Sequence, residues 1–245
     1  MNANETRASW RNYRYIAARF PRRFTLRLLL AGVTLLCIAL GIWTHRAREQ
    51  RRIVELIQSS GGTVWYDYEF NGLTPYPNSR APEFLVVWLG EDFFHEITLV
   101  ETSDSKVIHE LPRFRHLLEL RLYNPSITDD DLASISDLKS LRALDIAGRG
   151  GATAELTQIG DKSLERIAHL SKLYTVQVLG SRITSRGIEF IARLPSLQVL
   201  NLGCLDSGID DRTAENLRSR HIAFRIFRCA PNGSTTSVSE YGLGP

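Results

Sequence analysis

The residues able to do acid–base, nucleophilic or metal chemistry are scattered along this chain without a catalytic spacing. None of its six histidines stands in a His-Glu-x-x-His arrangement, which would place two zinc ligands on one helical face. The Gly-x-Ser-x-Gly sequence of a hydrolase nucleophile elbow is also missing. We therefore expect no catalytic residue, cofactor, metal or small-molecule substrate. Because Ser, His and Asp are plentiful, a hydrolase whose triad assembles only in the fold stays open as an alternative.

Two further stretches resemble ligand sites but are better explained otherwise. In "TDDD", Thr128 to Asp131, a calcium loop would need oxygen ligands spread over about twelve residues with a glycine turn. A capping box, in which the Thr128 hydroxyl caps a helix and Asp131 completes the box, fits better. The glycine-rich "AGRGGATAELTQ" lacks a phosphate-binding pattern, so we interpret it as a surface insertion that can still overhang the strands and contact a partner.

Positive charge is concentrated at one end of the chain. Residues 1–60 carry eleven Arg and three Glu, a balance of +8, whereas the remaining residues carry 19 basic and 24 acidic side chains, a balance of −5. A mildly acidic body is a poor electrostatic match for nucleic acid. We expect no nucleic-acid partner.

Within the basic end, Leu28 to Thr44 is free of charge and long enough, with its neighbours, to cross roughly 30 Å of hydrocarbon. The flanking arginines argue against a buried core helix, and no small-x-small site favours cleavage as a signal peptide. We predict an uncleaved single-pass membrane helix. Seven Arg precede it and four follow, which favours a cytoplasmic N-terminus and an extracytoplasmic body. The opposite insertion, giving a cytoplasmic scaffold or adaptor, stays open.

The segments after the membrane helix have distinct patterns. A juxtamembrane helix is predicted over 45–60, with Ile53, Val54 and Ile57 forming one apolar edge. Its arginines either bind anionic lipid headgroups or are simply solvated. A strand follows over 63–70 and a loop over 71–82. A short helix is then expected over 83–94. Its inward residues would be Phe84, Leu85, Trp88 and Leu89, and Trp88 would join Tyr66 and Tyr68 in a packed N-terminal cap.

From Phe94 onward one apolar pattern recurs. The spacing Leu-x-x-Leu-x-Leu starts at Phe94, Leu117, Leu141, Leu173, Leu197 and His221, at intervals of 23, 24, 32, 24 and 24 residues. Each unit predicts a short strand, a polar turn and a helix with three inward apolar positions. The predicted helical positions are Ile108, Leu111 and Phe114; Leu132, Ile135 and Leu138; Leu164, Ile167 and Leu170; Ile188, Ile191 and Leu194; and Ala214 and Leu217, with Arg220 as a departure. No unit can bury its apolar edge alone, so the units must stack.

These units resemble the leucine-rich repeat family in its ribonuclease-inhibitor-like α/β form. The family's turn is matched at Ile127-Thr128-Asp129, Ile159-Gly160-Asp161 and Ile183-Thr184-Ser185. Its post-strand Asn or Cys is matched only near Asn124 and at Cys229. "GGTVWYDYEF" and "WLGEDFFHEITLV", after an arginine-flanked anchor, also resemble bacterial membrane-anchored leucine-rich repeat proteins. The resemblance implies an α/β solenoid, with parallel strands on the concave side and helices on the convex side, after one transmembrane helix.

The expected organisation follows from these segments. It comprises a basic N-terminal segment 1–27, a transmembrane helix 28–44, a juxtamembrane helix 45–60, an N-terminal cap 61–93, repeats 94–229 and a flexible tail 230–245. Cys204 and Cys229 fall at nearly equivalent positions of neighbouring units, so a disulfide is geometrically open. Two reduced core thiols are the favoured interpretation.

The strand residues that point away from the core are the expected partner surface. Their predicted central column is polar in every unit and consists of Thr98, Arg121, Asp145, Gln177, Asn201 and Arg225. A solvated sheet face without a partner would be polar too. Tyr123 beside Arg121 favours binding, because Tyr and Arg often dominate interfaces. We expect Arg121 and Tyr123 to contribute most and Asp145 and Gln177 to set specificity, in a non-catalytic protein-binding module.

Overall fold

The computed structural model describes residues 26–69, 81–124, 126–147, 157–203, 209–229 and 235–236. The chain is an α/β protein with a mostly parallel, open sheet and a long apolar helix near its N-terminus. It divides into two compact units, Met1–His45 and Arg46–Pro245. Residues 71–80 of the predicted loop, most of the glycine-rich insertion and the tail beyond Cys229, apart from Thr235 and Thr236, lie outside the described residues.

Helix α1 (Leu26–Ser59) is long and apolar enough, by length and composition, to cross a membrane. Its apolar side chains up to Trp43 are exposed. The hydroxyls of Thr34 and Thr44 donate to the carbonyls of Leu30 and Leu40, at 2.8 and 2.9 Å, and so satisfy their polar groups inside the helix. The predicted membrane and juxtamembrane helices are therefore one unbroken helix.

The last turns of α1 belong to the folded body. Ile53, Val54 and Ile57 are buried in the same core as the sheet, as their apolar edge predicts. The Arg52 guanidinium also pairs with the Glu110 carboxylate at 2.9 Å. The sequence placed the start of the folded domain at residue 61, whereas the compact unit begins at Arg46. An apolar edge on a helix does not reveal from the sequence what covers it.

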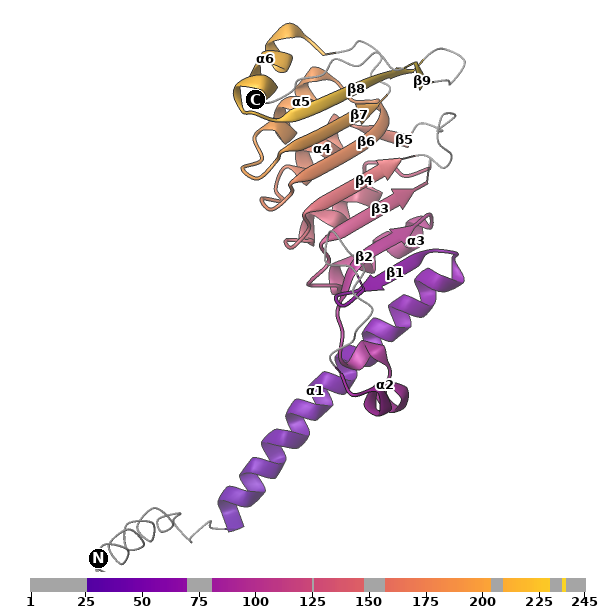
Figure 1. The fold of residues 1–245 in the computed structure, drawn as a ribbon, viewed down its shortest axis with the longest axis vertical. Coiled ribbons are helices and arrows are strands. Elements are labelled where there is room, and N and C mark those ends of the chain that lie inside the picture. The colour runs from indigo at the N-terminus through magenta and orange to yellow at the C-terminus, as the bar shows by residue number, and fades with distance from the viewer. Residues whose placement is uncertain are drawn as a thin grey trace, which may run out of the picture. The chain divides into compact units, whose positions relative to one another are not determined.

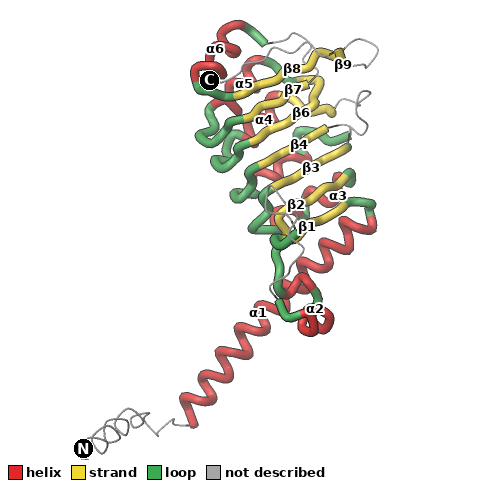
Figure 2. The backbone as a smooth tube through the Cα atoms, viewed as in Figure 1, coloured by secondary structure: helices red, strands yellow, loops and turns green. Residues whose placement is uncertain are grey.

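The sheet runs in the order β1-β2-β3-β4-β6-β7-β8-β9 (Figures 1 and 2). Its strands are β1 (Thr63–Tyr66), β2 (Ile97–Thr102), β3 (Glu119–Tyr123), β4 (Ala143–Ala147), β6 (Thr175–Arg182), β7 (Val199–Gly203), β8 (Ala223–Cys229) and β9 (Thr235–Thr236). Strands β2 to β8 pair in parallel, whereas β1 and β9 pair antiparallel at the two ends. A short strand, β5 (Thr157–Gly160), pairs in parallel with β6 outside this path.

Helical segments connect the parallel strands and lie on one side of the sheet (Figure 1). They are α3 (Ser105–Ile108), η3 (Leu111–Arg113), η4 (Asp131–Asp137), α4 (Asp161–Ile167), α5 (Ser185–Ala192) and α6 (Asp211–Ser219). Every apolar helical position that the repeat pattern predicts is buried, and Arg220 is exposed. The predicted inward faces are confirmed.

The first two connections are shorter and tighter than the predicted α-helices. Segments η3 and η4 are 3₁₀ helices, whose three residues per turn match the spacing of Leu132, Ile135 and Leu138. Pro112 lies in the first turn of η3, where it lacks an N–H to donate. In η4 the Ser136 hydroxyl donates to the Ala133 carbonyl at 2.8 Å. Such local bonds compete with regular α-helix.

The strand pairing aligns five of the six predicted strand segments as expected and corrects the position of the first. Two buried columns run through the paired strands: Val100, Leu120, Leu144, Val176, Leu200 and Phe224, and Thr102, Leu122, Ile146, Val178, Leu202 and Ile226. Val100 pairs with Leu120, an interval of 20 residues, so the first unit aligns from Ile97 and not from Phe94. The prediction failed because this strand has apolar residues at both alternating sets of positions, Ile97 and Leu99 in one set and Val100 in the other. The apolar spacing therefore could not show which set faces the core.

The predicted N-terminal cap is confirmed only in part. Tyr66 is buried, and its ring stacks on that of Tyr68 with centroids 6.0 Å apart. Helix α2 (Glu83–Leu89) forms, but Phe84 is 69% and Trp88 88% exposed, so the prediction that they point inward is wrong. Leu89 is exposed as well, and only Leu85 is half-buried. A seven-residue helix shows too few turns for its sequence to identify the covered face.

Candidate functional site

The sheet face opposite the helices carries the predicted partner surface, which we call the outer sheet face. Along β3, and along β4 up to Ile146, buried core residues alternate with half-buried residues of this face, whereas Ala147 at the end of β4 is buried. Strand pairing aligns one column across six strands: Glu101, Arg121, Asp145, Gln177, Asn201 and Arg225. Five members are as predicted. The first is Glu101 and not Thr98, which is buried, because the first unit is shifted in register.

Arg121 lies among carboxylates on this face. Its Nε and Nη2 atoms are 2.7 and 2.6 Å from one Glu119 oxygen, and its Nη1 is 3.9 Å from Glu101. Burial alone would lower the pKa of Arg121, but the hydrogen bond and charge of Glu119 outweigh burial and raise it. The guanidinium is therefore fixed and charged, while the surrounding surface, with Glu101, Glu119 and Asp145 against one Arg, is acidic.

Asp145 is the member of the column with an unmet hydrogen-bonding capacity. The Tyr123 hydroxyl donates to its Oδ2 at 3.4 Å, whereas its Oδ1 is buried and has no hydrogen-bond partner among the described residues. Burial raises the pKa of Asp145, although the positive charge of Arg121 acts in the opposite direction. Burial and the charge of Asp145 likewise raise the pKa of Tyr123, which stays a hydroxyl donor at neutral pH. A buried acceptor without a donor is costly.

The other half of the column has weaker internal contacts. The Asn201 side-chain amide donates to the Gln177 amide oxygen at 3.3 Å. Leu179 lies against Gly203 in the neighbouring strand, where a Cβ would meet the Leu179 side chain. Arg225 is exposed. The structure thus brings Arg121, Tyr123 and Asp145 into one cluster, and Gln177 adjoins it, between Asp145 on one neighbouring strand and Asn201 on the other.

Sequence reasoning missed Glu101 as the start of the column and Glu119 as the partner of Arg121. The outward position of Glu119 follows from the alternation of buried and half-buried residues along β3. Its contact with Arg121, two residues along the same strand, was not, because a Glu side chain can take many rotamers. The signal for Glu101 was its carboxylate opposite Arg121, visible only in the corrected register.

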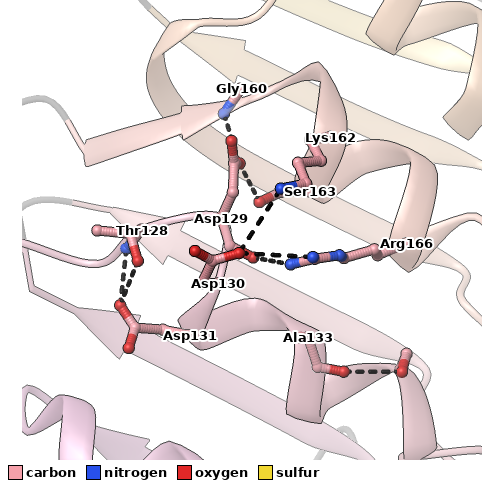
Figure 3. A network of polar contacts seen from close by, with 10 residues as sticks. Thr128, Asp129, Asp130, Asp131, Ala133, Gly160, Lys162, Ser163 and Arg166 are labelled. Carbon is pink, nitrogen blue, oxygen red and sulfur yellow. Dashed lines mark hydrogen bonds and ion pairs between the residues drawn. The ribbon is translucent and has the colours of Figure 1, made fainter.

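The acidic turn at Thr128 to Asp131 binds other parts of the chain (Figure 3). Asp129 accepts hydrogen bonds from the Gly160 N–H at 3.0 Å and from the Ser163 hydroxyl. Asp130 pairs with Arg166 at 3.5 Å and Lys162 at 3.7 Å. The three carboxylates serve separate partners, and the described residues contain no group of three or more His, Cys, Asp or Glu placed to hold a metal.

Only one of the two hydrogen bonds of the capping box predicted at this turn forms. The Asp131 carboxylate accepts from the Thr128 N–H at 2.9 Å, as a capping box requires. The Thr128 hydroxyl, however, donates to Asp131 at 2.8 Å, and the first residue before η4 has no side-chain capping bond. The predicted helix cap by Thr128 is therefore wrong, because a 3₁₀ segment places its N–H groups differently.

One hydrogen bond repeats between successive turns, and we call the series the turn ladder. Asp129, Asp161 and Ser185, the third residues of the three predicted turns, each accept from a backbone N–H of the next unit. The donors are Gly160, Thr184 and Asp210, at 3.0, 2.7 and 3.1 Å. Asp161 also accepts from the Thr184 hydroxyl at 2.6 Å. The turn sequence therefore links neighbouring units and is structural.

A second polar cluster lies at the N-terminal end of the body. The Gln50 amide donates to Asp92 Oδ1 at 3.1 Å and to the His95 carbonyl at 2.8 Å, and the Tyr66 hydroxyl donates to Asp92 at 3.0 Å. His95 Nδ1 lies 2.9 Å from Asp67. Burial raises the pKa values of Asp92 and Tyr66. These bonds fasten α1 to η2 (Glu91–Phe93) and the start of β2.

The remaining sequence predictions concern the cysteines and the insertion. Cys37 is a free, exposed thiol on α1. Cys204 and residues 148–156 of the insertion lie outside the described residues, and only the backbone of Cys229 is placed, at the end of β8. The predicted choice between a Cys204–Cys229 bridge and two thiols stays a prediction.

The fold and the outer sheet face define an α/β protein with an open, mostly parallel sheet and a helix able to cross a membrane. No protein-family model matches the chain, and no curated protein sequence is significantly similar to it.

Proposed function

We propose that the protein is a single-pass membrane protein whose body is a short leucine-rich-repeat solenoid and acts as a non-catalytic protein-binding module. Three observations support the solenoid: strands paired in chain order, two buried columns that run through all the units, and a turn ladder with one bond per step. A helix apolar enough to cross a membrane supports the anchor.

The observation that carries the proposed binding site is the buried Oδ1 of Asp145 on the outer sheet face, which accepts no hydrogen bond from the described residues. With Glu101 and Glu119 nearby, the cluster favours a partner that inserts a cationic donor, such as a Lys or Arg side chain. Arg121 and Tyr123 would supply the surrounding contact area, because both are half-buried and fixed by neighbours. A hydrogen-bond donor that reaches Asp145 contributes more binding free energy than a donor that reaches an exposed carboxylate, because the Asp145 acceptor is already desolvated.

The topology proposed is a cytoplasmic N-terminus with the repeats outside the cytoplasmic membrane, since more arginines precede the helix than follow it. A fusion of a compartment-sensitive reporter to the C-terminus tests it. Activity of the reporter in the cytoplasm alone would instead assign the repeats to a cytoplasmic scaffold.

Binding is tested by site-specific photo-cross-linking in native membranes. A photoreactive amino acid replaces Tyr123 in one variant and Glu165, an exposed residue of α4 on the helical side, in the matched control. We expect a discrete protein adduct from position 123 and none from position 165.

The adduct at position 123 should disappear when Arg121→Ala is added and should weaken with Asp145→Asn. With an isolated partner, Arg121→Ala and Tyr123→Ala should each weaken binding by more than about 1 kcal/mol without unfolding the body. Equal adducts from positions 123 and 165, or no effect of either alanine substitution, would remove the outer sheet face as the site.

A further inference from the structure

Helix α2 presents an apolar face that nothing in the described body covers. Phe84, Val87 and Trp88 are 69%, 78% and 88% exposed, and their i, i+3, i+4 spacing places them on one side of the helix. Leu89, at the end of the helix, is 45% exposed. Single exposed apolar residues are common on protein surfaces, but four within one seven-residue helix form a patch with a preferred apolar neighbour.

Hydrogen bonds fix the neighbourhood of α2 to a particular place along the chain. Leu89 precedes Asp92 by three residues, and Asp92 accepts from the Gln50 amide at 3.1 Å. The same amide donates to the His95 carbonyl at 2.8 Å. The Tyr66 hydroxyl adds a third bond to the cluster, at 3.0 Å from Asp92. The segment containing α2 is therefore attached to α1 at Gln50.

Gln50 lies close to the end of the apolar part of α1. It follows Thr44, the last residue of the uncharged stretch, by six residues. Even a fully extended chain of six residues spans only about 20 Å, and a helical one about 9 Å. If Leu28 to Thr44 crosses a bilayer, Gln50 must therefore lie within or just outside its headgroup region. This bound depends on chain length alone.

We propose that the exposed face of α2 inserts into the interfacial region of the phospholipid bilayer that α1 crosses, on the side where α1 leaves it. This inference rests on the proposed membrane anchoring. Trp and Phe are side chains that favour the boundary between headgroups and acyl chains. Arg46 and Arg48 on the neighbouring turns of α1 add positive charge that favours anionic headgroups, whereas Arg51 pairs with Glu55 at 3.0 Å. The chain would thus contact the bilayer twice, through a crossing helix and a helix lying in the surface.

The test uses full-length protein reconstituted into vesicles of zwitterionic and anionic phospholipid, some brominated on the upper acyl carbons. The chain has four tryptophans, so three single-tryptophan variants are prepared by replacing the others with Phe. One retains Trp88, one retains Trp43 in the apolar stretch, and one carries only Glu215→Trp. Glu215 is an exposed residue of α6 at the opposite end of the sheet, so that variant is the matched control.

We expect brominated lipid to quench Trp88 about as strongly as Trp43, with a blue-shifted emission, and to leave the Glu215→Trp variant unquenched. Quenching of Trp43 without quenching of Trp88 would overturn this inference and leave the anchor intact. If Trp43 is also unquenched, the proposed anchor itself fails. Trp88 that is unquenched by lipid yet shielded from aqueous iodide only in native membranes would assign the face to a protein partner and would likewise overturn the proposal.

Discussion

The Asp161 carboxylate occupies the space that a side chain on Gly187 would need. A Cβ built on Gly187, in the first turn of α5, would lie 2.9 Å from the Asp161 Cγ. From this position Asp161 accepts from both the N–H and the hydroxyl of Thr184, at 2.7 and 2.6 Å. Thr184 in turn caps α5 by accepting from the Arg186 N–H at 3.3 Å. The missing side chain of Gly187 is therefore what lets one unit bond to the next.

Gly187→Ala should destabilise the body by about 1–3 kcal/mol, because the added methyl displaces Asp161 from its bonds to Thr184. The ordinary gain of up to about 1 kcal/mol from replacing a helical glycine by alanine would be lost in this clash. Chemical denaturation of the variant measures the change. In an Asp161→Ala background the same substitution should cost at least about 1 kcal/mol less, and strict additivity of the two changes would contradict the proposed coupling.

A fragment of residues 46–245 should be more stable than one of residues 61–245. The shorter fragment loses Ile53, Val54 and Ile57, each nearly fully buried, at about 1.5–3 kcal/mol apiece. Denaturation midpoints of the two fragments provide the comparison. Should the shorter one not be soluble, Ile57→Ala within 46–245 still tests the point, with an expected loss of about 2–5 kcal/mol. Equal midpoints would show that the end of α1 does not support the core.

Leu144→Ala should lower the free energy of unfolding by about 2–5 kcal/mol. Leu144 is 1% exposed and lies in a buried column between Leu120 and Val176, so truncation leaves a cavity that its neighbours cannot fill. Because the units contact mainly their neighbours, the loss should appear as one earlier cooperative transition of the short array. Glu165→Ala, on the exposed side of α4, is the control and should change stability by no more than about 0.5 kcal/mol. A loss below about 1 kcal/mol at Leu144 would contradict the register.

The Asp145→Asn variant should gain stability relative to wild type as the pH rises. Burial raises the folded-state pKa of Asp145 above the ordinary 3.8, so its contribution to stability is fully present below the unfolded pKa and is lost as the pH rises through the folded one. Unfolding free energies of wild type and variant from about pH 3 to 7 measure this difference, which should grow in favour of the variant.

Asp210→Asn provides the contrast. Asp210 caps α6 by accepting from the Thr213 N–H at 2.8 Å. Hydrogen bonds from Thr213 lower the pKa of Asp210, so its contribution is present above the unfolded pKa and is lost as the pH falls. The difference should therefore grow in favour of wild type as the pH rises. The same sign for both variants would show that burial does not control Asp145.

Sequence periodicity predicted most of the body, because side-chain alternation and repeat length together determine which residues face the core. Leu120, Leu144 and Leu200 could be aligned from spacing alone, and Arg121 and Asp145 follow as their outward neighbours. Where adjacent strand residues are both apolar, as Leu99 and Val100 are, the spacing of apolar residues does not determine the strand register. The orientation of Trp88 was mispredicted for a different reason. Hydrophobicity indicates that a side chain favours an apolar environment, but it does not show that protein atoms supply that environment.

The sequence did not predict which particular side chains contact one another. Nothing in the order of residues pairs Gln50 with Asp92, or Glu119 with Arg121 in preference to solvent. The turn ladder is an intermediate case. The repeated Ile-Thr-Asp-like turns could be found in the sequence, but the donor that each third residue binds lies one unit away and depends on how the units stack.

The antiparallel strands β1 and β9 limit how such a chain can evolve in length. Each occupies an end of an otherwise parallel sheet, where a further parallel unit would have to attach. A duplicated unit can therefore be accommodated only by insertion between β2 and β8, where both of its neighbours already present matching buried columns. Growth or shrinkage between β4 and β8 would move the C-terminal end of the sheet relative to the acidic cluster around Asp145 by whole strand spacings, about 4.8 Å at a time, and would leave the distance of the cluster from the N-terminal end unchanged. The number of units between β4 and β8 thus sets how far this surface lies from the end of the sheet that carries β9.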